Sequence, residues 1–150
     1  MVQTHVLQTY IAKAEAELRD NILPFWMQHT LDRERGGFYG EVSNALVIDK
    51  DAVKGSLLTA RILWTYAAAY RRYQSAAYLD MAQYAYAALM DLFWDETYGG
   101  LYWSVTAEGV PHQTRKQIYG QAFGIYALAE YYAATGEQAV LDRALALFRM

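Results

Sequence analysis

The stretch that most constrains the fold is a helix-length run over residues 54–73, which is hydrophobic on nearly every side. A helix of this kind is typically buried rather than placed at a surface. One charged residue, Arg61, lies in the middle of the run. Because a guanidinium keeps its proton in proteins, a buried arginine must be paired or must face a polar cavity. The run therefore predicts the inner wall of a larger assembly, with Arg61 as a candidate polar group inside that wall.

The same pattern occurs a second time in the chain. Residues 116–135 align with residues 54–73 at an offset of 62, which aligns Trp64 with Tyr126. The loops before these helices also match, since residues 32–39 and 95–102 both follow the pattern DxxxGGxY. A self-match that runs through a loop and the helices around it indicates a repeat architecture.

Composition limits the classes of protein that fit. The chain has 150 residues, of which 55% are hydrophobic, so it has material for a core and disorder is excluded. A net charge of −3 argues against nucleic acid or an anionic membrane as partner. Without cysteine there is no disulfide framework and no thiolate metal site. No signal peptide and no membrane-spanning run is visible, so we expect a soluble cytoplasmic protein.

Hydrophobic periodicity predicts alternating outer and inner helices. Amphipathic outer helices are expected over 4–28 and 75–94, the first with a kink or an end near 21–23 because Pro24 follows. Inner helices are expected over 52–73 and 114–135, and a last outer helix begins near residue 138. Each inner helix is preceded by a glycine-containing loop, and residues 38–48 in the first loop predict a short β-hairpin or an extended loop.

This order amounts to about two and a half helix-pair units. Neither an all-round apolar helix nor an open edge of such a repeat buries itself alone. We therefore expect residues 1–150 to be the N-terminal portion of one longer domain that breaks off in the third helix pair. Six units of about 62 residues would close a ring. The predicted fold class is all-α, a partial (α/α)6 barrel with short β-hairpin loops.

Four segments carry a resemblance to a known family. They read GGFYGEV, KGSLLTARILWTYAAAYR, YGGLYWSV and TRKQIYGQAFGIYALAEYY. The chain from about residue 11 to residue 150 resembles the N-terminal part of the N-acylglucosamine 2-epimerase family, most closely the members that act on cellobiose. The resemblance implies an isomerase that inverts C2 of the reducing-end aldose in cellobiose or a similar β-linked disaccharide. It also implies that no metal or other cofactor takes part.

In this family one histidine removes the C2 proton and a second returns a proton to the other face. The resemblance places both of these histidines beyond residue 150. The histidines present here, His5, His29 and His112, match no catalytic position. We therefore expect the chain by itself to be inactive, and the full-length protein to be a monomer or homodimer whose partner is a small-molecule carbohydrate.

The resemblance also assigns site residues within the chain. Arg61 matches the arginine that stabilises negative charge on the oxygens of the ring-opened sugar. Phe123 matches an aromatic position that packs on the sugar beyond the reacting one. Tyr119 lies one helical turn before Phe123, so both side chains can face the same cavity. Lys116 and Gln121 are possible polar neighbours.

Structural roles compete with these assignments. Arg61 could belong to a structural ion pair, and Tyr119 and Phe123 could be core residues. Asp32 and Asp95 recur at matching places in the repeat, which favours turn capping. Trp103 could line the mouth of a cavity, although packing is the simpler interpretation.

Three other functions stay open. The enzyme could act on N-acylglucosamine, or on a free hexose as a mannose isomerase does. A glycoside hydrolase on the same barrel would need two carboxylates across the cavity, and Glu130 is the single carboxylate on an inner helix. A non-catalytic helical repeat protein would have exposed inner helices and should self-associate.

Overall fold

A computed structural model describes the backbone of residues 2–150 and the side chains from residue 6 onward, so the side chain of His5 lies outside the described part. The chain divides into two compact units, residues 1–31 and 32–150, and each is described by itself. Within the described range, no helix is both long and apolar enough to span a membrane.

The first unit is one continuous helical run. It comprises α1 (Val2–Ala16), the π-helical segment η1 (Glu17–Ile22) and α2 (Leu23–His29). The N–H of Leu23 donates to the carbonyl of Leu18, five residues back, which is the hydrogen bond of a π-turn. Pro24, just after this turn, has no N–H to donate. Where a kink or an end was expected near 21–23, the helix has a π-turn and continues to His29.

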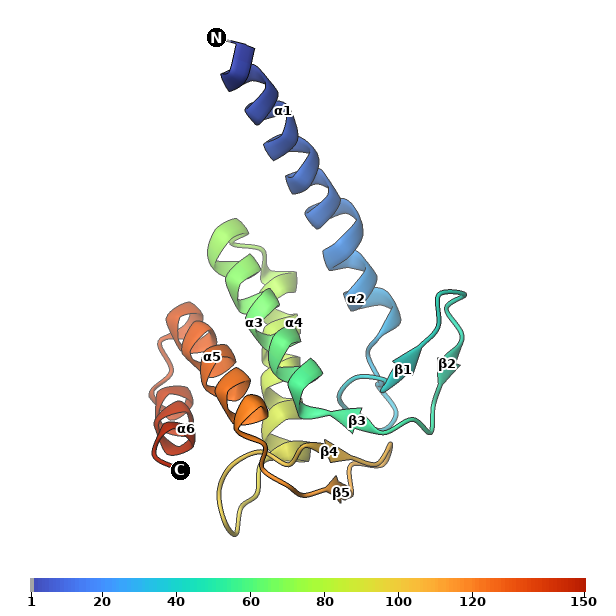
Figure 1. The fold of residues 1–150 in the computed structure, drawn as a ribbon, viewed down its shortest axis with the longest axis vertical. Helices are drawn as coiled ribbons and strands as arrows, with labels where there is room; N and C mark the ends of the chain where they lie inside the picture. Colours follow the sequence, from blue (N-terminus) through green and yellow to red (C-terminus); the bar gives the residue numbers. More distant parts are fainter. Residues whose placement is uncertain (1) are drawn as a thin grey trace. The chain divides into compact units, whose positions relative to one another are not determined.

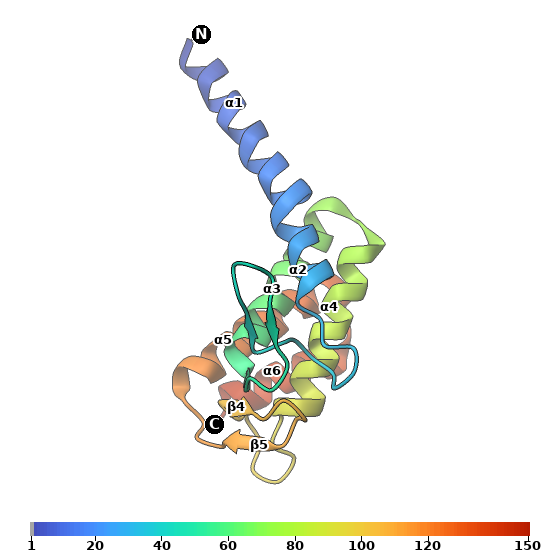
Figure 2. The same ribbon diagram turned by 90° about the vertical axis from the view of Figure 1, so that its right-hand side faces the viewer.

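The second unit packs its helices in two layers. Its helices are α3 (Ser56–Tyr73), α4 (Ala76–Ala88) with the π-helical segment η2 (Leu89–Phe93), α5 (Ile118–Thr135) and α6 (Gln138–Phe148). Helices α3 and α5 lie side by side, α4 packs behind α3, and α6 packs against α5 (Figures 1 and 2). The alternation of inner and outer helices that the repeat predicts is therefore confirmed.

The two inner helices end in the same way. Gly136 follows α5 in the left-handed region, with φ of 73°, and its N–H bonds the Tyr132 carbonyl at 2.7 Å. Gln74 follows α3 with φ of 54° and bonds the Tyr70 carbonyl at 2.7 Å. Glycine is the residue that adopts this conformation without strain, so the second repeat has the better helix end.

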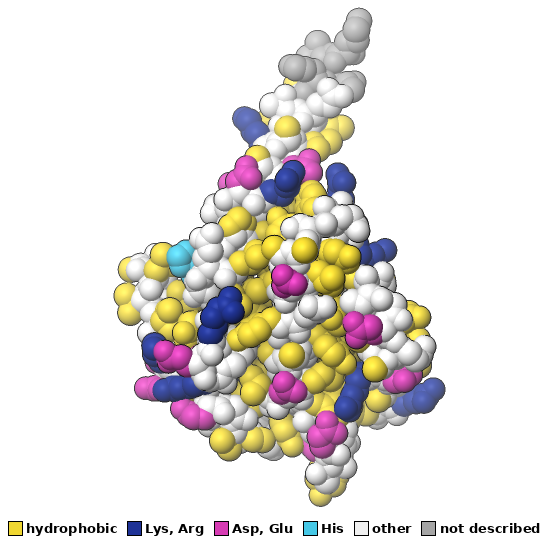
Figure 3. All heavy atoms as spheres, turned by 180° about the vertical axis from the view of Figure 1, so that it is seen from behind, with side chains coloured by type: hydrophobic (Ala, Val, Ile, Leu, Met, Phe, Trp, Pro, Cys, Tyr) yellow, Lys and Arg dark blue, Asp and Glu magenta, His cyan; other side chains and the backbone are white. Residues whose placement is uncertain are grey.

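The core lies between the two layers. The largest fully buried apolar side chains of this unit are Leu63, Tyr66, Leu89, Phe93, Leu101, Val105, Leu128, Tyr131 and Val140. On the face turned away from the viewer in Figure 1, hydrophobic side chains also gather near the centre, with acidic and basic side chains interspersed around them (Figure 3).

Short strands join the helices. Strands β1 (Glu41–Val42) and β2 (Ile48–Asp49) form the predicted hairpin, whose turn occupies residues 43–47. Strands β3 (Lys54–Gly55), β4 (Ser104–Val105) and β5 (Pro111–Gln113) form an antiparallel sheet in which β4 is central. The first inner helix begins at Ser56 rather than residue 52 because the preceding residues pair with β4. The N–H of Ser56 still donates to the Trp103 carbonyl at 3.1 Å.

A buried lysine–aspartate clamp holds the start of α3. One carboxylate oxygen of Asp32 accepts the N–H groups of Glu34 and Arg35 at 3.1 and 2.9 Å. The other oxygen accepts the ammonium of Lys54 at 2.7 Å, with the side chains of Asp32 and Lys54 only 2% and 3% exposed. The ammonium also donates to the Gly36 carbonyl at 2.6 Å. The clamp therefore fastens the glycine loop to the entry of the inner helix.

The second repeat builds the same clamp. One oxygen of Asp95 accepts the N–H groups of Thr97 and Tyr98 at 2.9 and 3.0 Å. The other accepts the ammonium of Lys116 at 2.6 Å. The N–H groups of Asp32 and Asp95 close both loops in the same way, onto the carbonyl of the second glycine. Turn capping by the two aspartates is confirmed.

Both clamps shift the acid–base behaviour of the aspartates. Burial opposes the charged form of Asp32, but hydrogen bonds from Lys54 and from the N–H of Arg35 hold its pKa below the usual value. The hydrogen bond from Lys116 is the main cause that lowers the pKa of Asp95 to about 2, assisted by the N–H of Tyr98. Both carboxylates are therefore ionised at neutral pH.

Replacing Lys54 tests the first clamp. Lys54→Met should lower the free energy of unfolding by roughly 3–5 kcal/mol, because it leaves the buried charge of Asp32 without its partner. Lys50→Met is a matched control, since Lys50 pairs with Glu34 where both side chains are more than half exposed, and it should cost no more than about 1 kcal/mol. Equilibrium guanidinium denaturation measures both, and equal losses would contradict a special role for the buried pair.

The second clamp predicts a pH dependence. A carboxyl whose pKa falls on folding stabilises the fold above its unfolded pKa of about 3.9 and loses that effect as the pH approaches the folded value. The stability difference between the wild type and Asp95→Asn should therefore be full at pH 7 and shrink between about pH 4 and pH 2. Denaturation at several pH values measures it, with Glu96→Gln in the same loop as control. A difference that stays constant across this range would contradict the clamp.

Candidate functional site

Arg61 and Phe123 occupy equivalent positions on neighbouring inner helices. Arg61 is the sixth residue of α3 and Phe123 the sixth residue of α5, as the repeat offset requires. The guanidinium carbon of Arg61 lies 6.0 Å from the centroid of the Phe123 ring, within the range of a cation–π contact. The structure thus brings together two of the residues that the sequence assigns to the site.

Tyr119, the third assigned residue, belongs to a row of rings on the same face. Its ring meets Phe123 edge-on at 5.0 Å between centroids, and Phe123 meets Tyr126 edge-on at 6.3 Å. Tyr126 in turn stacks on Trp64 of α3 at 5.0 Å. We call these four residues, Trp64, Tyr119, Phe123 and Tyr126, the aromatic face. Tyr119 and Tyr126 are 57% and 51% exposed, so their hydroxyl groups are available to a ligand.

Arg61 lies on the side of α3 that residues 32–150 leave uncovered. Its side chain is exposed, because α3 buries the opposite side. The buried side of α3 consists of Ser56, Thr59, Ala60, Ile62, Leu63, Tyr66, Ala67 and Ala69. Among the side chains that the structure describes, none forms a hydrogen bond or ion pair with the Arg61 guanidinium. Arg61 is therefore a permanent positive charge on an open aromatic surface.

The polar residues expected near the site have structural roles instead. Lys116 is held by Asp95 in the second clamp. The side-chain amide of Gln121 bonds both backbone groups of Leu101, donating to its carbonyl and accepting from its N–H, each at 2.8 Å. Sequence spacing placed both residues on the inner helix or at its entry but could not show which way they point.

The carboxylate of Glu130 is also engaged. It pairs with Arg71 at 2.6 Å, and Arg71 lies in the last turn of α3. This pair ties the C-terminal halves of the two inner helices together. It leaves no free carboxylate among the α3 and α5 side chains.

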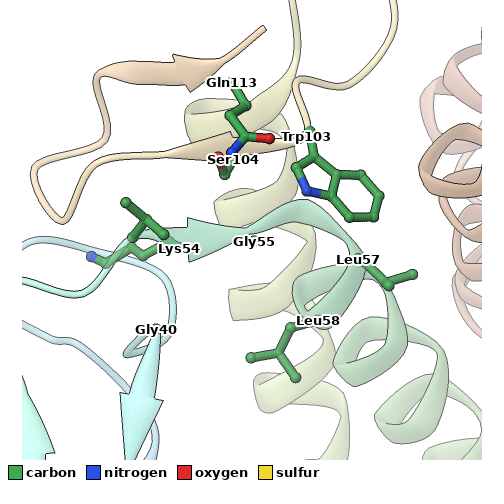
Figure 4. Close-up of a pocket in the computed structure, with 9 residues that line it drawn as sticks. Gly40, Lys54, Gly55, Leu57, Leu58, Trp103, Ser104 and Gln113 are labelled. Carbon is green, nitrogen blue, oxygen red and sulfur yellow. The ribbon is translucent and has the colours of Figure 1, made fainter. Parts of the chain in front are cut away.

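A pocket of about 320 Å³ opens at the N-terminal end of α3. It is lined by Gly40, Val53, Lys54, Gly55, Leu57, Leu58, Trp103, Ser104 and Gln113, most of which Figure 4 labels. Trp103, for which packing was the simpler expectation, is half-buried and forms one wall. In the first repeat the position of Trp103 is taken by Gly40, so the repeat itself gave no signal for an aromatic wall.

The histidines with described side chains make contacts with residues outside the aromatic face. His29 contacts the Phe25 ring at 5.3 Å within the first unit. The Nδ1 atom of His112 in β5 lies 3.2 Å from the hydroxyl of Ser104. No group of three or more histidine, aspartate or glutamate side chains in the described part of the chain is arranged to hold a metal ion.

Comparison with known proteins places the chain in a family. Residues 14–149 match the family model of N-acylglucosamine 2-epimerase (GlcNAc 2-epimerase). A cellobiose 2-epimerase from Bacteroides fragilis is 46% identical over 134 residues, which are 89% of this chain and 34% of that protein. The solved structure of cellobiose 2-epimerase from Bacillus thermoamylovorans matches with a TM-score of 0.91 at 45% identity, over 95% of this chain and 36% of that one.

A more distant structure shares the fold alone. A glycoside hydrolase family 76 mannosidase from Bacteroides thetaiotaomicron is 23% identical, with a TM-score of 0.71 over 94% of this chain and 37% of that one. The predicted fold class, part of an (α/α)6 barrel, is confirmed by these neighbours. The chain spans about a third of the length of the relatives it matches. It belongs to the N-acylglucosamine 2-epimerase family.

Proposed function

We propose that residues 1–150 form the N-terminal part of one (α/α)6 barrel in a sugar 2-epimerase. The whole protein would invert C2 of the reducing-end aldose in cellobiose or a similar β-linked disaccharide. Family membership supports the reaction class. The observation that carries the proposal is the unpaired Arg61 guanidinium, 6.0 Å from the Phe123 ring on an open aromatic face.

Arg61 fits the electrostatic demand of this reaction. In the open-chain sugar, removal of the C2 proton moves an electron pair toward C1 and leaves negative charge on the carbonyl oxygen. Fixed donors aimed at an oxygen where charge develops supply a large share of such catalysis. A guanidinium does not lose its proton in proteins, so it can donate hydrogen bonds to this oxygen without transferring a proton to it. Because a proton returns to C2 from the opposite side, the substrate undergoes no net oxidation, and the proposal includes no cofactor.

The aromatic face suits the rest of the sugar. Phe123 offers an apolar surface to the C–H groups of a sugar ring, while Tyr119 and Tyr126 present rings with exposed hydroxyls. A binding site that combines apolar walls with a few polar groups is typical of small-molecule ligands. Phe123 and Tyr119 are therefore proposed as substrate-binding residues and Arg61 as a catalytic one.

The proton-transfer groups are proposed to lie elsewhere in the whole protein. Inversion needs a base on one side of C2 and an acid on the other, each within hydrogen-bond reach. Within the second unit, the His112 ring contacts the hydroxyl of Ser104 and the carboxylate of Glu130 is bound by Arg71. The family resemblance matches none of the histidines of this chain to a catalytic position. The 150-residue chain alone is therefore expected to be inactive.

A glycoside hydrolase is the second candidate because a mannosidase shares the fold. Fold does not fix function, however, and hydrolysis on such a barrel needs two carboxylates facing the cavity. The described aromatic face carries a cation and rings instead, which favours the epimerase.

Within the family, N-acylglucosamine or a free hexose such as mannose is the alternative substrate. The proposal also includes a cytoplasmic monomer or homodimer.

Replacement of Arg61 tests its role. In the whole protein, Arg61→Ala should lower kcat for C2 epimerisation by about 10²–10³-fold, the effect of losing one charge-stabilising donor. Arg71→Ala is the matched control on the same helix. Arg71 pairs with Glu130 farther toward the C-terminal ends of α3 and α5, so its loss should leave kcat within about threefold.

The two variants also separate a catalytic from a structural arginine. Far-ultraviolet circular dichroism and thermal unfolding should show that Arg61→Ala keeps the fold, because its side chain is exposed. Near-wild-type turnover of Arg61→Ala would show that Arg61 is not part of the catalytic machinery.

Hydrogen exchange at C2 tests the reaction class directly. In D₂O the whole protein should replace the C2 hydrogen of cellobiose with deuterium, because the proton passes through a group that equilibrates with solvent. Nuclear magnetic resonance follows the loss of the C2 signal, and mannose and N-acetylglucosamine serve as competing substrates. The isolated 150-residue chain should show no exchange. Release of free glucose instead of exchange would favour the hydrolase.

A further inference from the structure

We propose that the Trp103 pocket, the cavity described above, binds the second sugar of the disaccharide, the ring that does not react. This inference rests on the proposed function and adds a subsite to it. Trp103 would be the stacking platform of that subsite and Gln113 a hydrogen-bonding group.

The position of the pocket relative to Arg61 supports this assignment. Leu57 and Leu58 line the pocket from α3 and precede Arg61 by four and three residues. They therefore lie on the same face of α3 as Arg61. At a rise of 1.5 Å per residue, Leu57 is about 6 Å from Arg61 along the helix axis. A ligand that holds its reacting end at Arg61 would reach the pocket with its next ring.

The Trp103 side of the pocket also adjoins the aromatic face, through α5. A Cβ atom built on Gly120 would lie 3.5 Å from the six-membered ring of Trp103, so the indole packs against α5 at that point. Gly120 directly follows Tyr119 and precedes Phe123 by three residues. The Trp103 pocket therefore lies next to the aromatic face, about one helical turn closer to the N-terminal ends of α3 and α5.

The chemistry of the lining suits a neutral sugar ring. The indole of Trp103 faces the pocket together with Leu57 and Leu58 (Figure 4). In a β-linked glucose the hydroxyls are equatorial and the axial C–H groups form an apolar surface, which an indole can cover. Within the described part of the chain, the indole N–H of Trp103 and the side-chain amide of Gln113 have no hydrogen-bond partner. Both are therefore free to bond sugar hydroxyls.

Charge in the lining argues against an anionic ligand. Lys54 is the charged residue of the lining, and its ammonium points away from Trp103 and Gln113 (Figure 4). The first clamp holds that ammonium on Asp32 and on the Gly36 carbonyl, at 2.7 and 2.6 Å. A phosphate in the pocket would have no free cation to bind. The volume of about 320 Å³ is at the lower end of the range of about 300–1,000 Å³ for ligand sites, which suits one sugar ring.

The platform is held in place by the backbone. The N–H of Trp103 donates to the Gln113 carbonyl at 2.9 Å, and the Trp103 carbonyl accepts the N–H of Ser56 at 3.1 Å. These bonds join β4 to β5 and to the start of α3. A platform fixed before the ligand arrives costs less to order on binding.

The test compares a disaccharide with a single sugar in the whole protein. Trp103→Leu should lower kcat/KM for epimerisation of cellobiose by about tenfold or more, while kcat/KM for glucose changes by less than about twofold. Trp103→Phe keeps a ring and should restore most of the loss for cellobiose. Tyr98→Leu removes an exposed ring of the same loop outside the pocket and should leave both values unchanged.

Each outcome decides the proposal. Equal losses for cellobiose and glucose, or no loss for either, would overturn the subsite. A wild-type protein that epimerises neither sugar would overturn the proposed function and the subsite with it.

Gln113→Ala provides a second test, because the Gln113 side chain is exposed and its replacement should not disturb folding. It should reduce kcat/KM about threefold or more for cellobiose and leave glucose unaffected.

Discussion

The buried contact between Lys54 and Asp32 is the interaction on which the rest of this structure depends. It joins the glycine loop to the start of α3 with both side chains almost fully buried. Lys116 and Asp95 repeat the contact at the start of α5. Because each pair fixes where its inner helix begins, residues at equal distances from the clamps reach the same depth. Arg61 and Phe123 meet for this reason.

The proposed site residues lie where the two repeats differ. The scaffold positions are equivalent, yet one carries a guanidinium and the other a phenyl ring, and the rings of Trp64 and Tyr126 stack beside them. At the loop position before the helix the first repeat has Gly40 and the second has Trp103. A repeat can therefore keep its clamps for stability while single positions facing the inner side change to suit a ligand.

The sequence was sufficient for the helix order, the repeat, the fold class and the turn-capping aspartates. It was insufficient where side-chain direction or long-range pairing decides. The first hairpin was predicted, but the sheet of β3, β4 and β5 was not, because β3 and β4 pair although they are far apart in the sequence. The direction of the Arg61 side chain was not predicted, because an apolar run around the whole of α3 does not show which side of the helix these residues cover. The bonds of Lys116 to Asp95 and of Gln121 to Leu101 could not be predicted for the same reason.

The most direct test of the account is a crystal structure of the whole protein with the alditol of cellobiose, which mimics the open chain of the substrate. The account predicts the Arg61 guanidinium within about 2.7–3.2 Å of an oxygen at C1 or C2, the distance of a hydrogen bond. It also predicts that the sugar beyond the reacting one packs on Phe123 and reaches the Trp103 pocket. A structure in which Arg61 pairs with a carboxylate and the alditol binds away from α3 and α5 would contradict it.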